Sequence, residues 1–92
     1  MDMTEIEDLK LYDIHELEEI FGVDRHVIYK YRESGLLKAR KVNKSWRSSG
    51  MEIREFYRVT AGRDISNYTK MVILANQIKN AAAVQERTAV TR

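Results

Sequence analysis

Cysteine and proline are missing from the 92-residue sequence, and glycine occurs only four times. Without cysteine the chain can form no disulfide framework, no thiolate zinc site and no cysteine nucleophile, which fits a reducing cytoplasm. No apolar run approaches the roughly 18 residues of a membrane span, and residues 1–10 are acidic where a signal peptide would be basic and then apolar. We therefore expect a soluble, cytoplasmic protein without a membrane partner.

The length also limits what the chain can do. A chain of this size forms one small domain, and it buries roughly 60 to 65% of its unfolded surface, too little for a deep pocket between two lobes. The sequence has no HExxH motif, no phosphate-binding glycine loop and no paired catalytic carboxylates. His15 and Glu19, one helical turn apart, are more typical of a surface ion pair than of a metal site. We therefore expect no enzyme, no cofactor and no metal.

Charge is distributed unevenly along the chain. The net charge is only +2, but residues 1–24 carry nine acidic side chains against one lysine, a balance of −8. Residues 25–63 carry eleven basic side chains against three glutamates, a balance of +8, and residues 64–92 add the remaining +2. A basic block is typical of a surface that binds a polyanion. It is equally typical of a solvated surface whose charges fall in blocks, so charge alone leaves both interpretations open.

Two short helices separated by a tight turn are predicted from caps and spacing. Asp13 and Glu16 can form a capping box, and apolar residues then recur at helical spacing as far as Gly22, a natural helix stop. Asp24 can cap a second helix that ends at Gly35. The apolar positions are Ile14, Leu17, Ile20 and Phe21 in the first helix and Val27, Ile28 and Tyr31 in the second. This is the spacing of a helix-turn-helix.

A hairpin and a third helix are predicted next. Residues 36–42 and 45–47 flank Asn43 and Lys44, a short polar turn in which asparagine tolerates a positive φ. After residues 48–50, where a serine can cap, apolar residues return at helical spacing. These residues, which we expect to face the core, are Met51, Ile53, Phe56 and Tyr57. The predicted order is helix, turn, helix, hairpin and helix.

Local motifs in this stretch resemble a known family. The most specific motifs are the turn Gly22-Val23-Asp24 and the pair Trp46-Arg47. An aromatic residue and Gly35-Leu36-Leu37, which close the second helix, are a further specific motif. With Ile53 and Phe56 they resemble the winged helix-turn-helix DNA-binding domain shared by MerR-type regulators and phage or plasmid excisionases, over roughly residues 11–57. No proline follows the Gly-Leu-Leu, and no long coiled coil or effector-binding domain is visible, so we expect the excisionase-like group to be the closer match.

The resemblance implies a mainly α fold with a small β-hairpin wing. It also implies that the second helix enters the major groove of DNA, while the wing lies on the adjacent backbone or minor groove. We expect Trp46 to pack against the second helix rather than to stack on nucleic acid.

The candidate DNA-contacting residues are basic or aromatic. The apolar arc of the second helix leaves four of them on its outer side: Arg25, His26, Tyr29 and Lys30. The candidates in the hairpin and its flank are Lys38, Arg40, Lys41, Lys44 and Arg47. Arginine can fork onto guanine O6 and N7, lysine and tyrosine can reach phosphate, and unpaired amides at a helix start attract phosphate. For His26 and Tyr29 a merely solvated position is an equally open alternative.

The C-terminal third contains a polar linker at residues 59–67 and another predicted helix. Ser66 can cap this helix, which covers residues 68–92 and should fray from Val84 onward. A narrow apolar seam runs along it, made of Tyr68, Met71, Val72, Ala75, Ile78 and Ala82. The seam either packs back on the domain or joins two copies, and both alternatives stay open. Two copies would place two recognition helices on repeated half-sites.

The predicted organisation is an acidic flexible arm at residues 1–10, a winged helix-turn-helix at 11–58, the linker, and the C-terminal helix. A further hypothesis is that the arm folds over the basic surface and competes with DNA. We expect a non-enzymatic, sequence-specific double-stranded DNA-binding protein of a phage, plasmid or conjugative element, either an accessory or architectural factor or a regulator. It would be similar to excisionases or to relaxosome and partition accessory factors.

The expected partners are double-stranded DNA, further copies of the chain, and a recombinase or relaxase. The alternatives are a transcriptional repressor of the same fold and a protein-interaction module that reuses the fold.

Overall fold

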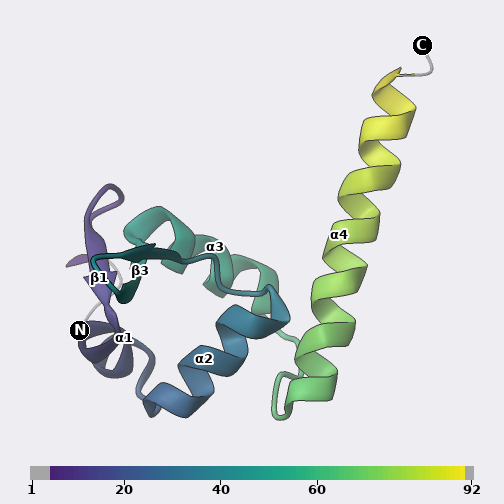
Figure 1. The fold of residues 1–92 in the computed structure, drawn as a ribbon. Coiled ribbons are helices and arrows are strands. Elements are labelled where there is room, and N and C mark those ends of the chain that lie inside the picture. Colours follow the sequence, from purple (N-terminus) through teal and green to yellow (C-terminus); the bar gives the residue numbers. More distant parts are fainter. Residues whose placement is uncertain (1–4, 91–92) are drawn as a thin grey trace.

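Short helices pack around a small antiparallel sheet, and a longer helix extends away from them (Figure 1). The computed structural model describes residues 5–90, with side chains described as far as residue 82. In chain order the elements are β1 (Leu11–Asp13), α1 (Ile14–Phe21), α2 (Arg25–Ser34), β2 (Arg40–Val42), β3 (Ser45–Ser49), α3 (Gly50–Thr60) and α4 (Tyr68–Val90). The sheet order is β1-β3-β2, with both pairs antiparallel. The predicted mainly α fold with a hairpin wing and a C-terminal helix is confirmed.

The first two helices begin and end at the predicted residues. The Asp13 carboxylate accepts the amide of Glu16 at 2.9 Å, and the Glu16 carboxylate accepts the amide of Asp13 at 3.2 Å, which completes the capping box. α1 ends at Gly22, whose φ of 68° lies in the left-handed region that favours glycine. Asp24 caps α2, and Gly35 ends it. Local capping chemistry therefore sets the geometry of the helix-turn-helix.

β2, β3 and their turn form the wing. Asn43 and Lys44 at its tip have φ of 49° and 69°, and a pair of positive values is what a type I′ hairpin turn requires. β2 is shorter than the predicted strand over residues 36–42, because Leu36 and Leu37 are buried in the core before the strand begins.

β1 adds a third strand that the sequence does not predict. Tyr12 lies opposite Ser48 of β3, and both side chains are buried. The Tyr12 hydroxyl accepts the amide of Glu7 at 3.0 Å. Three residues are too few to show a strand periodicity, so this strand depends on tertiary pairing with β3.

Residues 5–10 pack against the domain, which differs from the flexible arm predicted at residues 1–10. Ile6 is buried in the core. Arg54 of α3 donates to the carbonyl of Ile6 at 2.6 Å and pairs with Asp8 at 2.7 Å. The acidic composition predicts a flexible arm, but the buried Ile6 side chain and backbone hydrogen bonds hold the segment against the domain. The described part of the arm therefore lies against α3 and not over the basic surface of α2.

Gly50 permits the close approach of this segment. A Cβ at Gly50 would lie 2.0 Å from the carbonyl oxygen of Glu7. The Gly50 amide donates to the Lys10 carbonyl at 3.1 Å, and the Met51 amide donates to the Asp8 carbonyl at 3.0 Å. Two backbone hydrogen bonds thus join the N-terminal segment to the start of α3.

α3 begins at the predicted serine cap, Ser49, but only part of its predicted apolar face is buried. Ile53 and Phe56 are buried as expected. Met51 is 53% exposed, so the prediction that it faces the core is wrong. Tyr57 is 37% exposed, so its side chain is only partly buried. Met51 lies two residues before Ile53, a rotation of about 200° around the helix, which turns it to solvent.

The connection between α3 and α4 is shorter than the predicted linker, because α3 continues to Thr60. Asn67, not Ser66, caps α4, and its side chain accepts the amide of Lys70 at 2.9 Å. The Ser66 amide donates to Asp64 at 3.0 Å, in a turn that precedes the helix. Ser66 therefore belongs to the turn and not to the cap.

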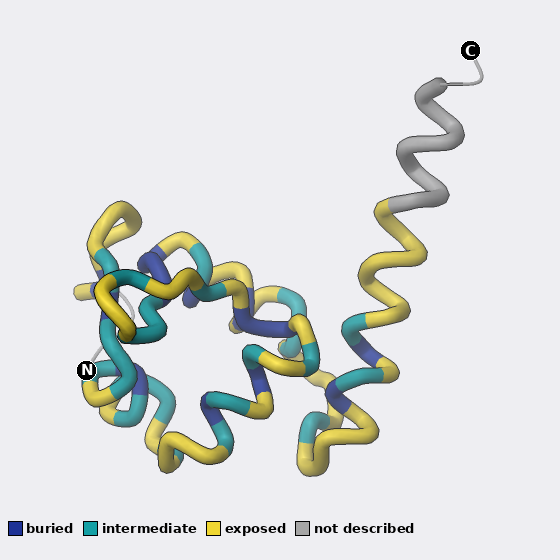
Figure 2. Tube along the Cα trace, viewed as in Figure 1, coloured by how far each residue is buried: buried dark blue, intermediate teal, exposed yellow. Residues whose placement is uncertain are grey.

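α4 is attached to the domain by its first turns (Figure 2). Met71 and Leu74 are buried in the core, and this part of α4 packs on α2. All residues from 76 to 82 are exposed. The fraying predicted from Val84 to Arg92 falls outside the residues whose side chains are described.

Candidate nucleic-acid interface

The outer face of α2 carries the residues predicted to read DNA. Three of these side chains are exposed and the tyrosine ring is half-buried: Arg25, His26, Lys30 and Tyr29. Two amides at the start of the helix are already bonded, because Asp24 Oδ1 accepts the amide of His26 at 2.9 Å and that of Val27 at 3.3 Å. The prediction of unpaired amides that attract phosphate is therefore wrong for these two amides.

α2 and the wing meet at a cleft of about 280 Å³, called the α2–wing cleft below. Its walls are the start of α1, the first turns of α2 and the tip of the wing. The lining residues are Asp13, Ile14, His15, Arg25, Tyr29, Lys44, Ser45 and Trp46. Arg25 and Tyr29 of the helix and Lys44 of the wing thus converge on one cleft. His26 and Lys30 lie on the outer face of α2 and do not line it.

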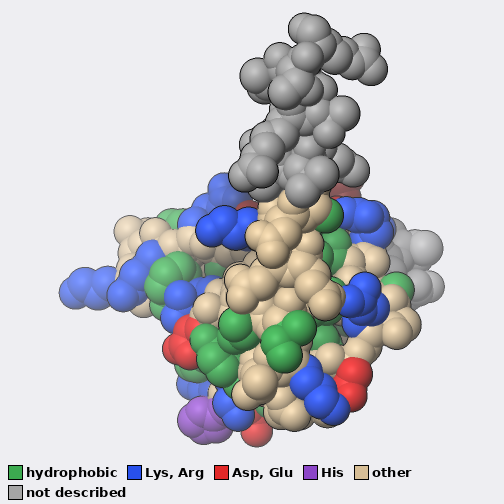
Figure 3. Space-filling model, turned by 90° about the vertical axis from the view of Figure 1, so that its right-hand side faces the viewer, with side chains coloured by type: hydrophobic (Ala, Val, Ile, Leu, Met, Phe, Trp, Pro, Cys, Tyr) green, Lys and Arg blue, Asp and Glu red, His purple; other side chains and the backbone are tan. Residues whose placement is uncertain are grey.

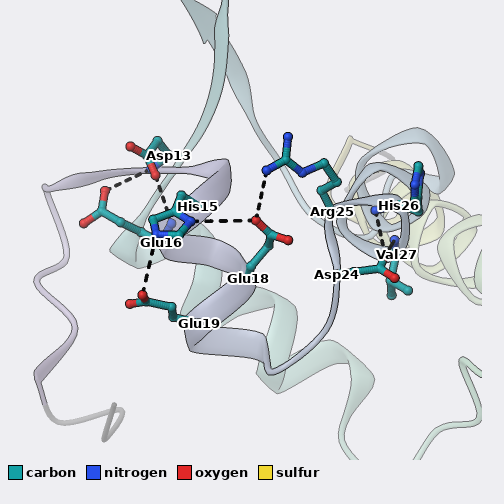
Figure 4. Close-up of polar contacts among 9 residues, drawn as sticks. All are labelled: Asp13, His15, Glu16, Glu18, Glu19, Asp24, Arg25, His26 and Val27. Atoms are coloured by element: carbon teal, nitrogen blue, oxygen red, sulfur yellow. Dashed lines mark hydrogen bonds and ion pairs between the residues drawn. The ribbon is translucent and has the colours of Figure 1, made fainter.

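Arg25 is drawn toward α1 by a carboxylate (Figure 4). Its Nη2 atom lies 3.5 Å from Oε1 of Glu18. The same oxygen lies 4.0 Å from Nδ1 of His15. Figure 4 shows the Arg25 side chain reaching from the start of α2 back over the turn. A candidate base-reading side chain is thus oriented by the preceding helix.

Trp46 attaches the wing to α2, as predicted. The guanidinium carbon of Arg32 lies 3.9 Å from the centre of the Trp46 ring, and Nζ of Lys41 lies 5.8 Å from it. Both are cation–π contacts, and Lys41 stands opposite Trp46 in the β2–β3 register. Sequence reasoning missed Arg32, because a contact between a helix and a distant strand leaves no local signal.

The remaining predicted cations of the wing and flank lie away from the α2–wing cleft. Arg40 pairs with Glu52 of α3 at 2.8 Å. Arg47 lies opposite Arg40 in the register, so both side chains project from the face of the wing opposite to Trp46. Nε of Arg47 is buried with no hydrogen-bond partner among the described residues. Lys38 lines a different groove, so these three are not brought together with Arg25.

That second groove has a volume of about 560 Å³ and runs between the end of α2, α3 and α4. Its apolar lining residues are Leu36, Val59, Ala75, Ile78 and Ala82. Figure 3 shows hydrophobic side chains gathered on the outer side of the lower half of α4, between basic side chains. The apolar lining of the groove itself includes residues of the domain and residues of α4.

The structure divides the predicted dimerisation seam on α4. Met71 is buried in its own domain, and Val72 and Ala75 are half-buried. The exposed members are Tyr68, Ile78 and Ala82. Met71 cannot contact a second copy while it fills the core, so only the exposed members could do so. The same helix thus has one residue of the seam buried in the domain and others that are exposed.

Nδ1 of His15 lies 4.0 Å from the Glu18 carboxylate, and Nε2 lies 3.8 Å from that of Glu19. Among the side chains that the structure describes, no group of three or more histidine and acidic residues is placed to hold a metal ion. Within the same part of the chain, no helix has the length and apolar character needed to cross a membrane.

Comparison with known proteins bears on the stretch that holds the α2–wing cleft. A family model described as helix-turn-helix domain matches residues 11–58, which run from β1 into α3. No curated protein and no solved structure was found to match the chain. The family match covers more than half of the sequence, and the two capped helices, the turn and the wing lie inside it. The chain therefore belongs to the helix-turn-helix domain family and is a DNA-binding helix-turn-helix protein.

Proposed function

We propose that the protein is a non-enzymatic, sequence-specific double-stranded DNA-binding factor of a phage, plasmid or conjugative element. It acts as an accessory, architectural or regulatory protein, like an excisionase or a relaxosome or partition factor. The observation that carries the proposal is the convergence of Arg25 and Tyr29 of α2 with Lys44 of the wing on one cleft. The protein partners that this role implies are further copies of the chain and a recombinase or relaxase.

In this proposal α2 reads base edges in the major groove. Arg25 is the first residue of α2, and the first residues of a recognition helix are those that reach base edges. Its guanidinium can fork onto guanine O6 and N7. Lys30 is exposed one turn after His26 on the outer face of the helix, where it can reach the same strand or a phosphate.

The wing contacts the DNA backbone or the adjacent minor groove. Lys44 is exposed at the tip of the hairpin, and Lys41 is exposed on the wing face that carries Trp46. Because Arg32 holds Trp46 against α2, the spacing between helix and wing is fixed, and both can engage one duplex. Arg40 is paired with Glu52 and contributes less to phosphate binding.

The proposal is tested by measuring duplex affinity at a series of salt concentrations, with duplexes selected from a random pool. About five phosphate contacts give a log-log slope near −4.5. Lys44→Ala should weaken all duplexes alike and make the slope shallower by about 0.9. The matched control is Lys79→Ala, an exposed lysine of α4 outside the α2–wing cleft, which should change neither quantity. A flat salt response, or no binding to any duplex, would contradict the proposal.

The second groove favours an alternative, a protein-interaction module that reuses the fold. Its apolar lining includes Leu36 and Ile78, and it lies apart from Arg25 and Lys44. A partner bound there would give an affinity that depends little on salt, because apolar burial dominates such a contact. A transcriptional repressor of the same fold would use the α2–wing cleft and would differ only in the location of its target sites.

A further inference from the structure

We infer that Glu18 is a specificity-determining residue of the DNA site. Its carboxylate orients the guanidinium of Arg25 for a base contact and at the same time opposes non-specific contact between that guanidinium and the DNA backbone. The inference rests on the proposed function, since it assigns a role within the same site.

The position of Glu18 is set by the helix-turn-helix itself. The carbonyl of Glu18 accepts the amide of Gly22 at 2.9 Å, in the bond that closes α1. Its side chain therefore leaves the last turn of α1 directly across from the first residue of α2, with Oε1 3.5 Å from Nη2 of Arg25. The Glu18 side chain is only 24% exposed, whereas that of the neighbouring Glu19 is 66% exposed. A largely buried carboxylate thus faces a guanidinium whose side chain is 57% exposed.

A guanidinium carries five N–H donors in a planar fork, so one edge can stay bonded to Glu18 while another forks onto guanine. Holding Arg25 in one orientation before binding lowers the entropy lost when a directional base contact forms. A phosphate contact gains less from this orientation, because a diffuse electrostatic attraction accepts many side-chain positions.

The negative charge of Glu18 weakens DNA binding, whereas its orientation of Arg25 favours a specific base contact. A carboxylate close to a polyanion repels every duplex, whatever its sequence. In a specific complex the orientation of Arg25 offsets this repulsion, whereas in a non-specific complex the repulsion is not offset. Glu18 therefore lowers non-specific affinity more than specific affinity, and the ratio of the two affinities rises.

The test compares Glu18→Gln with Glu19→Gln, which removes the same charge one residue further along α1. Glu19 lies on the far side of His15 from Arg25, and it pairs with His15 at 3.8 Å (Figure 4). Both variants are titrated with a duplex selected from a random pool and with a scrambled duplex of the same composition. Glu18→Gln should tighten scrambled-duplex binding and lower the specificity ratio by roughly two- to fivefold, the size of an exposed ion-pair effect. Glu19→Gln should leave the ratio unchanged.

A second pair of measurements separates orientation from general repulsion. In an Arg25→Ala background, Glu18→Gln should no longer change the specificity ratio, because no guanidinium is left to orient. Equal effects of the two glutamine variants, or an effect of Glu18→Gln that persists without Arg25, would overturn the inference while leaving the proposed function intact. A wild-type protein that binds no duplex would overturn the proposed function itself.

Discussion

The guanidinium carbon of Arg32 lies 3.9 Å from the centre of the Trp46 ring. This contact joins α2 to the wing, and Lys41 approaches the same ring at 5.8 Å. Helix α2 and the wing, which carry the candidate DNA contacts, are therefore joined by the contact of Arg32 with the indole ring, while Lys41 contacts that ring from within the wing. A DNA site that uses both elements depends on this contact.

Replacing Trp46 should loosen the wing. Trp46→Ala removes both cation–π contacts, and we expect it to lower the free energy of unfolding by about 1 to 2 kcal/mol and to weaken duplex binding. Trp46→Phe keeps an aromatic ring and should restore most of both quantities. Urea unfolding and duplex titration of the two variants measure this. Duplex binding by Trp46→Ala with wild-type affinity would show that the wing does not need this attachment.

Replacing Gly50 should displace the N-terminal segment. A Cβ at this position would lie 2.0 Å from the backbone oxygen of Glu7, which cannot move aside as a flexible side chain could. Gly50→Ala should therefore lower the free energy of unfolding by about 1 to 3 kcal/mol. Hydrogen exchange should also show faster exchange of the Met51 amide, which donates to Asp8, with α2 unaffected. Unchanged stability and unchanged Met51 protection would contradict the close approach.

The pKa of the Asp64 carboxyl is held well below its usual 3.8 by hydrogen bonds from Lys70 and then from Ser66. Because the pKa is lower in the folded state, the interaction stabilises the fold above the unfolded pKa, and the contribution is lost as the pH falls through the folded pKa. Asp64→Asn should therefore lower the free energy of unfolding by a small, constant amount at neutral pH, and the difference from wild type should shrink in acid below pH 3.8.

Urea unfolding of both proteins across this pH range measures the difference. Replacing Lys70 with Met should raise the pKa of Asp64 toward its usual value, as followed by NMR titration of the carboxyl. A difference between wild type and Asp64→Asn that grows as the pH falls would contradict the sign of the effect.

α4 allows its two roles to be separated by mutation. Met71 is buried, so Met71→Ala should lower the free energy of unfolding by about 2 to 5 kcal/mol. Ile78 is exposed, and Ile78→Ser should leave the stability of the single chain nearly unchanged. If the exposed residues 76–82 of α4 join two copies of the chain, Ile78→Ser should lower the association constant in sedimentation experiments. An association constant equal to that of the wild type would exclude this part of α4 as the interface.

The parts of the fold that the sequence predicts well are those set by neighbouring residues. Asp13 and Asp24 are capping residues, and Gly22 adopts a positive φ, so each marks a helix boundary without help from the rest of the chain. The Asn43-Lys44 turn predicts the wing for the same reason. Helix boundaries and hairpin turns are local properties, and a single sequence contains them.

The parts of the fold and of the site that the sequence does not predict depend on tertiary contacts. β1 forms because Tyr12 pairs with β3, and its three residues show no pattern of their own. The acidic segment before it looks flexible by composition, yet Ile6 fills a place in the core. The sequence does not identify Arg32 and Glu18 as site residues. The role of Arg32 depends on Trp46, and that of Glu18 depends on the fold of the turn. No periodicity in the sequence reports such contacts.

NMR mapping of the protein during titration with a selected duplex shows whether α2 and the wing form one DNA site. If DNA occupies the α2–wing cleft, the largest shifts should fall on the amides of Arg25, Tyr29 and Lys44 and on the indole N–H of Trp46. Lys38 and Lys79, which line the second groove, should change little. Shifts that concentrate at the second groove and leave Arg25 and Lys44 unchanged would contradict the claim that helix and wing form one DNA site.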